Sequence, residues 1–74
     1  MKMKRFENAS DKVNVILSVF EEGEKLRGKD IVERLRKKGY KVKHAHLRMF
    51  IYYNMLYKYL KKEKKNGTNY YSLN

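Results

Sequence analysis

Seventy-four residues are enough for one compact domain and too few for two, and the absence of cysteine excludes disulfide bonds, thiol catalysis and thiolate metal sites. The apolar share of 42% predicts a chain that folds, but a core this small leaves no room for a deep substrate pocket. No long apolar stretch follows the basic N-terminus, so we expect no membrane span, no secretory signal and a cytoplasmic location.

The net charge of +11 is concentrated in the C-terminal half of the chain. Residues 1–35 contain eight lysines or arginines and seven acidic residues, whereas residues 36–74 contain eleven lysines or arginines and one acid, Glu63. A surface charged only for solubility mixes the two signs, whereas segregated positive charge is typical of a protein that binds a polyanion. We therefore expect nucleic acid as the partner.

The first predicted element is an amphipathic helix. Apolar residues at the spacing i, i+3, i+4, i+7 predict that it begins at Asn8 or Ser10 and is stopped by Gly23. Val15 and Val19 widen its apolar stripe, which indicates either deeper burial or a surface for a partner.

A short extended contact at Leu26 precedes the second predicted helix. This helix begins at Gly28 or Lys29, runs to Lys38 and is ended by Gly39. No small polar residue precedes it, so Gly28 is the expected cap.

The third predicted helix spans residues 43–53 and ends at Asn54, which tolerates the left-handed conformation. After it the apolar period changes from helical to alternating, which predicts a strand that starts near Leu56. The pair Asn66-Gly67 is a strong hairpin signal, and Thr68–Leu73 is the returning strand.

This arrangement resembles a winged helix-turn-helix domain over about residues 10–73. The resemblance is carried by Leu26–Val32 followed by Leu35, by the turn at Gly39, by the apolar face Leu47/Phe50/Ile51 and by the hairpin Leu60–Leu73. It implies an α+β fold of three helices followed by a C-terminal β-hairpin wing, in the order helix, short strand, helix, helix, strand, strand. Residues 1–9 are then a basic N-terminal arm and residues 10–74 the domain. Small basic members of this family are common among transcription regulators, including those of archaeal viruses and plasmids.

The resemblance also implies how double-stranded DNA is bound. The helix 43–53 lies in the major groove, and the wing 61–67 contacts the backbone or the minor groove. Helical geometry puts Ala45, Met49 and Tyr52 opposite the core side, flanked by His46 and Arg48, and Arg48 contacts either guanine or phosphate. The expected DNA-binding residues are Lys37, Lys38, Lys41, Lys43, His44, Ala45, His46, Arg48, Met49, Tyr52, Lys61, Lys62, Lys64, Lys65 and Asn66.

Several features have a second interpretation. The charged hairpin can simply block an exposed sheet edge, although the charge around it favours DNA. The basic residues Lys2, Lys4 and Arg5 form either an arm that reaches DNA or a frayed tail, and the tail is favoured. The tyrosines can stack on unpaired bases, but packing of the hairpin against the helices is favoured for Tyr52, Tyr53, Tyr57, Tyr59, Tyr70 and Tyr71.

No catalytic or cofactor site is expected. His44 and His46 point about 200° apart on a helix, so they cannot bind one metal together, and no Ser/His/Asp set or Gly-rich phosphate loop is present. The main hypothesis is therefore a sequence-specific transcriptional regulator that acts as a homodimer. A non-specific or architectural nucleic-acid binder and a winged-helix protein-interaction module are the alternatives.

Overall fold

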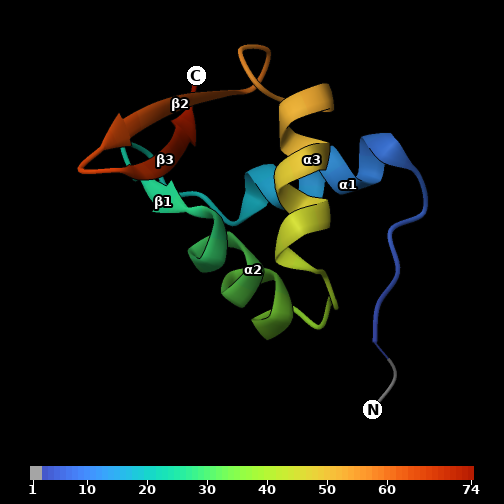
Figure 1. Ribbon diagram of the computed structural model, residues 1–74. Helices are drawn as coiled ribbons and strands as arrows, with labels where there is room; N and C mark the ends of the chain where they lie inside the picture. The colour runs from blue at the N-terminus through green and yellow to red at the C-terminus, as the bar shows by residue number, and fades with distance from the viewer. Residues whose placement is uncertain (1–2) are drawn as a thin grey trace.

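Three helices and a three-stranded antiparallel sheet make up residues 3–74, the part of the chain that the computed structural model describes (Figure 1). Figure 1 shows the helices grouped together and the sheet beside the start of α2. The order of elements predicted from the sequence is confirmed, as is the α+β class. The elements are α1 (Ala9–Ser18), β1 (Leu26–Arg27), α2 (Gly28–Lys37), α3 (His44–Asn54), β2 (Leu60–Lys65) and β3 (Thr68–Leu73).

The sheet has the order β1-β3-β2, so the last strand is the central one. Leu26 of β1 and Lys62 of β2 both lie opposite Tyr71 of β3. The predicted hairpin turn is confirmed: Asn66 and Gly67 have φ values of 51° and 79°, the positive angles that a two-residue turn of this kind requires.

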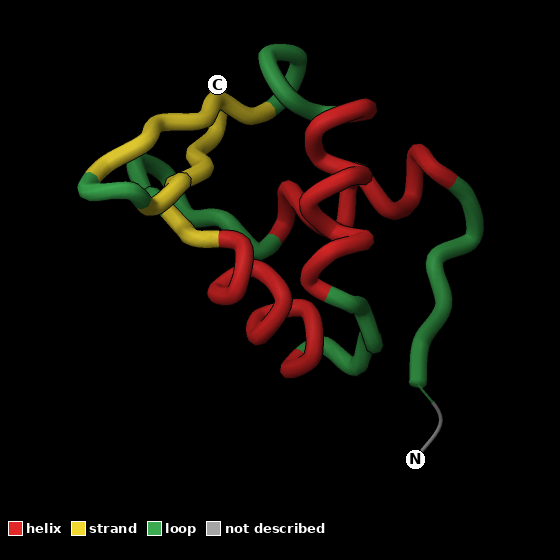
Figure 2. Tube along the Cα trace, viewed as in Figure 1, coloured by secondary structure: helices red, strands yellow, loops and turns green. Residues whose placement is uncertain are grey.

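The strand predicted to start near Leu56 begins only at Leu60. Residues 55–59 instead form a tight turn after α3, drawn as a loop in Figure 2, in which Tyr57 has a φ of 67° and its N–H donates to the Leu60 carbonyl. Met55 and Leu60 are both fully buried at its two ends. Tyr57, Lys58 and Tyr59 are all exposed, so the alternation of the sequence from Leu56 does not correspond to a strand before Leu60.

Helix α1 is capped by Asn8, whose Oδ1 accepts a hydrogen bond of 2.8 Å from the Asp11 N–H. The helix ends at Ser18, well before the predicted stop at Gly23. The chain leaves the helix early because Val19 and Phe20 turn inward and are buried in the core. The expected stop at Gly23 is thus wrong by about one turn.

The start of α2 is capped by Asp30 and not by Gly28. One carboxylate oxygen of Asp30 accepts hydrogen bonds of 3.0 Å from both the backbone N–H and the side-chain Nε of Arg27. The other accepts from Arg27 Nη2 at 3.1 Å, and these side-chain hydrogen bonds hold the pKa of Asp30 below its usual value. An acid one turn into the helix can therefore replace a small polar cap.

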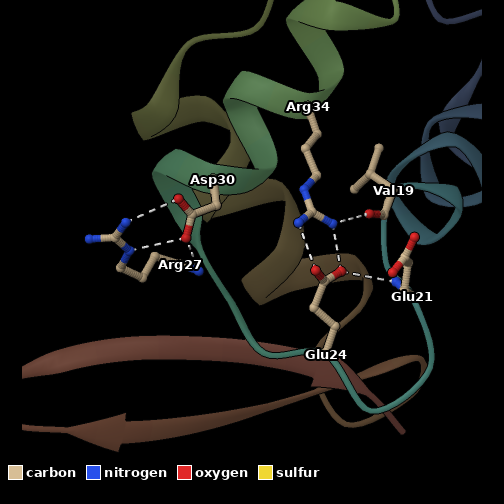
Figure 3. A network of polar contacts seen from close by, with 6 residues as sticks. All are labelled: Val19, Glu21, Glu24, Arg27, Asp30 and Arg34. Atoms are coloured by element: carbon tan, nitrogen blue, oxygen red, sulfur yellow. Dashed lines mark hydrogen bonds and ion pairs between the residues drawn. The ribbon is translucent and has the colours of Figure 1, made fainter.

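Arg34 of α2 fastens the loop between α1 and β1 (Figure 3). Its guanidinium donates to both carboxylate oxygens of Glu24, at 2.5 and 2.6 Å, and to the Val19 carbonyl at 2.8 Å. Glu24 also accepts the Glu21 N–H at 3.0 Å. The Arg34 hydrogen bonds lower the pKa of the Glu24 carboxyl, so this ion pair persists at neutral pH.

Every helix and strand contributes buried residues to the core. Val19 is buried in it, and Val15 is partly buried against it, so the chain itself covers much of the wide apolar stripe that begins in α1. Of the two interpretations of this stripe, deeper burial is confirmed for Val19, and the homodimer stays a prediction. The buried apolar residues are Ile16, Val19, Phe20, Leu26, Ile31, Val32, Leu35, Val42, Leu47, Ile51, Met55, Leu60 and Tyr71.

The segment before α1 lies against the connection between α2 and α3. The Lys4 N–H donates to the Gly39 carbonyl at 2.8 Å, and the ring of Phe6 stacks on Tyr40 with centroids 4.6 Å apart. The interpretation as a frayed tail is therefore wrong for Lys4, whereas Lys2 lies outside the described residues. None of the helices in residues 3–74 is long and apolar enough to cross a membrane.

Candidate nucleic-acid interface

Two neighbouring clefts meet at Arg48 of α3. The first, which we name the tip cleft, lies between the start of α2, the start of α3 and the hairpin turn. The second, the α3 cleft, lies between the exposed face of α3 and one face of the hairpin. The tip cleft is lined by Arg27, Gly28, Lys29, His44, Arg48, Gly67, Thr68, Asn69 and Tyr71, and the α3 cleft by Ala45, Arg48, Met49, Tyr52, Tyr53, Lys62, Asn69 and Tyr71.

The tip cleft depends on a close approach of α2 to α3 at Gly28. A Cβ atom at this position would lie 2.6 Å from Nε2 of His44, which is inside van der Waals contact. Glycine therefore leaves room for the His44 imidazole against the first turn of α2. This contact brings His44 and Arg48 to the same cleft as Lys29 of α2.

The pleat of β2 divides the hairpin lysines between two faces. Leu60 is buried, and successive side chains of a strand alternate, so Lys62 and Lys64 share the face that lies toward α3. Their cross-strand partners on β3 are Tyr71 and Asn69, which line the clefts.

Lys61 and Lys65 point to the opposite face of the hairpin. Glu63 lies on that face too, and it binds Lys25 with an Nζ–Oε2 distance of 3.1 Å. Lys65 and Asn66 line a separate hollow with this pair. The sequence grouped four wing lysines and Asn66 together, but the structure puts only Lys62 and Lys64 on the side of Arg48.

A third basic hollow lies on the other side of α3. Its polar lining consists of Lys12, Lys41, Lys43 and His46, over a floor that includes Phe6, Val42 and Leu47. His46 therefore faces away from the hairpin, whereas Arg48 faces it. We name this surface the N-terminal hollow.

Lys12 of α1 is the part of the N-terminal hollow that the sequence did not identify. Its Nζ lies 4.4 Å from the centre of the Phe50 ring and 5.4 Å from that of Phe6. Burial lowers the pKa of Lys12, while the two ring faces favour its charged form. Lys12 lies in the nearly neutral half of the sequence, so only its neighbours in space connect it with Lys41 and Lys43. Lys29 and Arg27 were missed for the same reason.

Lys37 and Lys38 lie apart from the clefts at Arg48. Lys37 lines a hollow on another face of α2 together with Asp30, Glu33 and Arg34. Lys38 is exposed at the end of α2. The structure thus brings together His44, Ala45, Arg48, Met49, Tyr52 and Lys62 of the predicted set.

The expected packing role of the tyrosines holds only in part. Tyr71 is buried and Tyr70 is half-buried, but Tyr52, Tyr53, Tyr57 and Tyr59 are all exposed. Tyr52 and Tyr53 face solvent because Leu47 and Ile51 already fill the core side of α3. The favoured interpretation is therefore wrong for these four residues.

The three ion pairs of residues 3–74 neutralise Lys25, Arg27 and Arg34. Within that range, Lys29, Arg48, Lys62 and Lys64 take part in none. The surface formed by α3 and the inner face of the hairpin therefore keeps its positive charge. It can attract phosphate groups, and Arg48 is the side chain placed to donate two parallel hydrogen bonds.

Comparison of the chain with protein-family models, with curated proteins and with solved structures returns no match. The described residues also contain no group of three His, Cys, Asp or Glu side chains placed to bind a metal ion.

Proposed function

We propose that this chain is a winged helix-turn-helix protein that binds double-stranded DNA and regulates transcription. In this proposal α3 lies in the major groove, with Ala45, Arg48, Met49 and Tyr52 toward the base edges, and the hairpin is the wing. An α-helix fits the major groove of B-DNA, which is about 12 Å wide. The exposed face of α3 is free of acidic residues, as is the whole segment 34–62.

The observation that carries the proposal is the placement of basic side chains on both flanks of α3. Lys62 and Lys64 lie on the hairpin side, and Lys41 and Lys43 lie on the side of the N-terminal hollow. The two phosphate strands that border a major groove run along both sides of an inserted helix. Each flank can therefore neutralise one strand while Arg48 lies between them.

Selection of binding sites from a random duplex pool tests the proposal, with Arg48→Ala as the variant. Loss of a bidentate contact with guanine costs about 1–3 kcal/mol and relaxes the preference at one base pair. Lys37→Ala is the matched control because it removes one charge from the α2 face that Asp30 and Glu33 share. It should leave both affinity and preference nearly unchanged.

The same selection separates the two classes of DNA binder. A recovered sequence motif that weakens with Arg48→Ala supports a sequence-specific regulator. Equal recovery of unrelated duplexes supports the architectural alternative, and no duplex binding at moderate salt removes both.

The homodimer is a separate proposal, because Val19 is buried in the chain's own core and Val15 is partly buried against it. It requires a selected site made of two inverted halves and a dimeric mass by light scattering. A single unrepeated site together with a monomeric mass would remove it.

A further inference from the structure

Three large side chains on α3 are exposed next to one another without a covering element. Met49 is 58% exposed, Tyr52 62% and Tyr53 73%, and all three line the α3 cleft. The two tyrosine rings touch edge to face, with centroids 5.0 Å apart and an interplanar angle of 88°. The rings therefore support one another while their outer faces remain open to solvent.

The charge around these rings restricts what can cover them. Arg48 and Lys62 line the same cleft, and no Asp or Glu occurs between Arg34 and Lys62 in the sequence. A ligand that is complementary to this surface has flat apolar faces joined to negatively charged groups. Unpaired nucleotides have both, since the base stacks on an aromatic ring while the phosphate binds a cation.

We propose that Tyr52 and Tyr53 form a stacking site for unpaired bases of single-stranded nucleic acid, with Arg48 and Lys62 binding the adjoining phosphates. This activity goes beyond the proposed binding of duplex DNA. In a duplex the faces of each base are covered by its neighbours, and only base edges reach the groove. Tyr52 and Tyr53 therefore gain a stacking partner only where the strands are separate.

The experiment measures the binding of fluorescent single-stranded oligo-dT and oligo-U by anisotropy, and quenching of 2-aminopurine within the same strands. Comparison of the two strands distinguishes DNA from RNA as the source of the bases. In the variant Tyr52→Leu/Tyr53→Leu we expect affinity to fall about tenfold or more and the quenching to disappear. Tyr52→Phe/Tyr53→Phe keeps both ring faces and should keep both signals.

Tyr59→Leu is the matched control. Tyr59 is a 45% exposed tyrosine in the turn at residues 55–59, outside the α3 cleft. An equal loss of affinity in this control would overturn the stacking site. So would unchanged binding in Tyr52→Leu/Tyr53→Leu, or self-association that protects these two tyrosines in the free protein.

The outcomes also separate this inference from the proposed function. Duplex binding without oligo-dT or oligo-U binding overturns the stacking site alone. Single-strand binding that depends on Tyr52 and Tyr53, without duplex binding, supports the stacking site and removes the duplex proposal. Loss of both kinds of binding overturns both.

Discussion

The two faces of strand β2 allow a test in which charge is held constant and only position changes. The double variants Lys62→Gln/Lys64→Gln and Lys61→Gln/Lys65→Gln each remove two positive charges from the same six-residue strand. The first pair lies on the face of Tyr71 and Asn69, toward α3. The second pair lies on the face of Glu63. Any effect of net charge alone must be the same in both variants.

The expected effect follows from counterion release. Each phosphate contact contributes about −0.9 to the slope of log K against log salt concentration. If about six cations on the two flanks of α3 meet phosphates, the slope of the native chain is about −5. Loss of two contacts in Lys62→Gln/Lys64→Gln reduces it to about −3.5.

The same relation gives the change in affinity. At about 0.15 M salt each contact contributes roughly fivefold, so two contacts amount to a loss of about thirtyfold. The variant Lys61→Gln/Lys65→Gln acts only over a distance at which salt screens the charge, and it should lose less than about threefold with the slope unchanged.

The assay is fluorescence anisotropy with a short labelled duplex, titrated between about 50 and 200 mM salt. All four lysines are exposed, so neither variant disturbs the core. Equal losses in the two variants would refute the assignment of one hairpin face to DNA. An unchanged slope in Lys62→Gln/Lys64→Gln would refute the phosphate contacts themselves.

Three further predictions concern the stability of the fold. The carboxyls of Glu24 and Asp30 have lowered pKa values in the folded chain, so on acidification the unfolded chain takes up protons first. The urea midpoint should therefore fall as the pH drops below about 4. A urea midpoint that stays constant down to the folded pKa values of the two carboxyls would contradict these ion pairs. Tyr57→Gly should raise the free energy of unfolding by about 0.5–1 kcal/mol, because glycine adopts the φ of 67° found at Tyr57 without strain and the exposed ring contributes little packing. A decrease in that free energy would show that the ring packs in solution. Ile51→Val should lower that free energy by about 0.5–1.5 kcal/mol because Ile51 is fully buried, and no change in urea denaturation would show that this face of α3 is loosely packed.

Much of the fold could be predicted because local periodicity and turn chemistry agree with the final packing. Leu47 and Ile51 at helical spacing are both fully buried, and Asn66-Gly67 forms the hairpin turn. The prediction of a strand from Leu56 was wrong because the chain first turns back after α3, and this turn exposes residues 57–59 in a row, so the alternation in the sequence does not correspond to alternating burial. The end of α1 was misplaced because long-range contacts, and not a glycine, end the helix. Val19 and Phe20 are buried in the core, and Arg34 donates a hydrogen bond to the Val19 carbonyl.

The candidate site could be predicted where one helix carries it. Helical geometry alone put Ala45, Met49 and Tyr52 on the exposed face of α3, and all three line the α3 cleft. The sequence could not show that Lys12 joins Lys41 in space, because α1 and the segment before α3 meet only in the folded chain. Helical spacing already puts Lys37 on the same face of α2 as Asp30 and Glu33, but the sequence could not show that this face lies apart from the clefts at Arg48, because the orientation of α2 depends on packing.

The positions of the acidic residues explain why the net charge of +11 leaves one surface of the molecule strongly positive. Glu24, Asp30 and Glu63 each bind a cation in an ion pair that fastens one segment of the chain to another or caps a helix. The Lys25–Glu63 and Arg34–Glu24 pairs neutralise positive charge outside the clefts at Arg48, and the Arg27–Asp30 pair neutralises one cation of the tip cleft. The acid-free segment 34–62 leaves the outer face of α3 unneutralised. The potential over α3 thus depends on where the acids are placed as much as on the number of lysines. It follows that Glu63→Gln, which raises the net charge, should strengthen duplex binding far less than Lys62→Gln weakens it, because Glu63 and Lys25 lie on the opposite face of the hairpin.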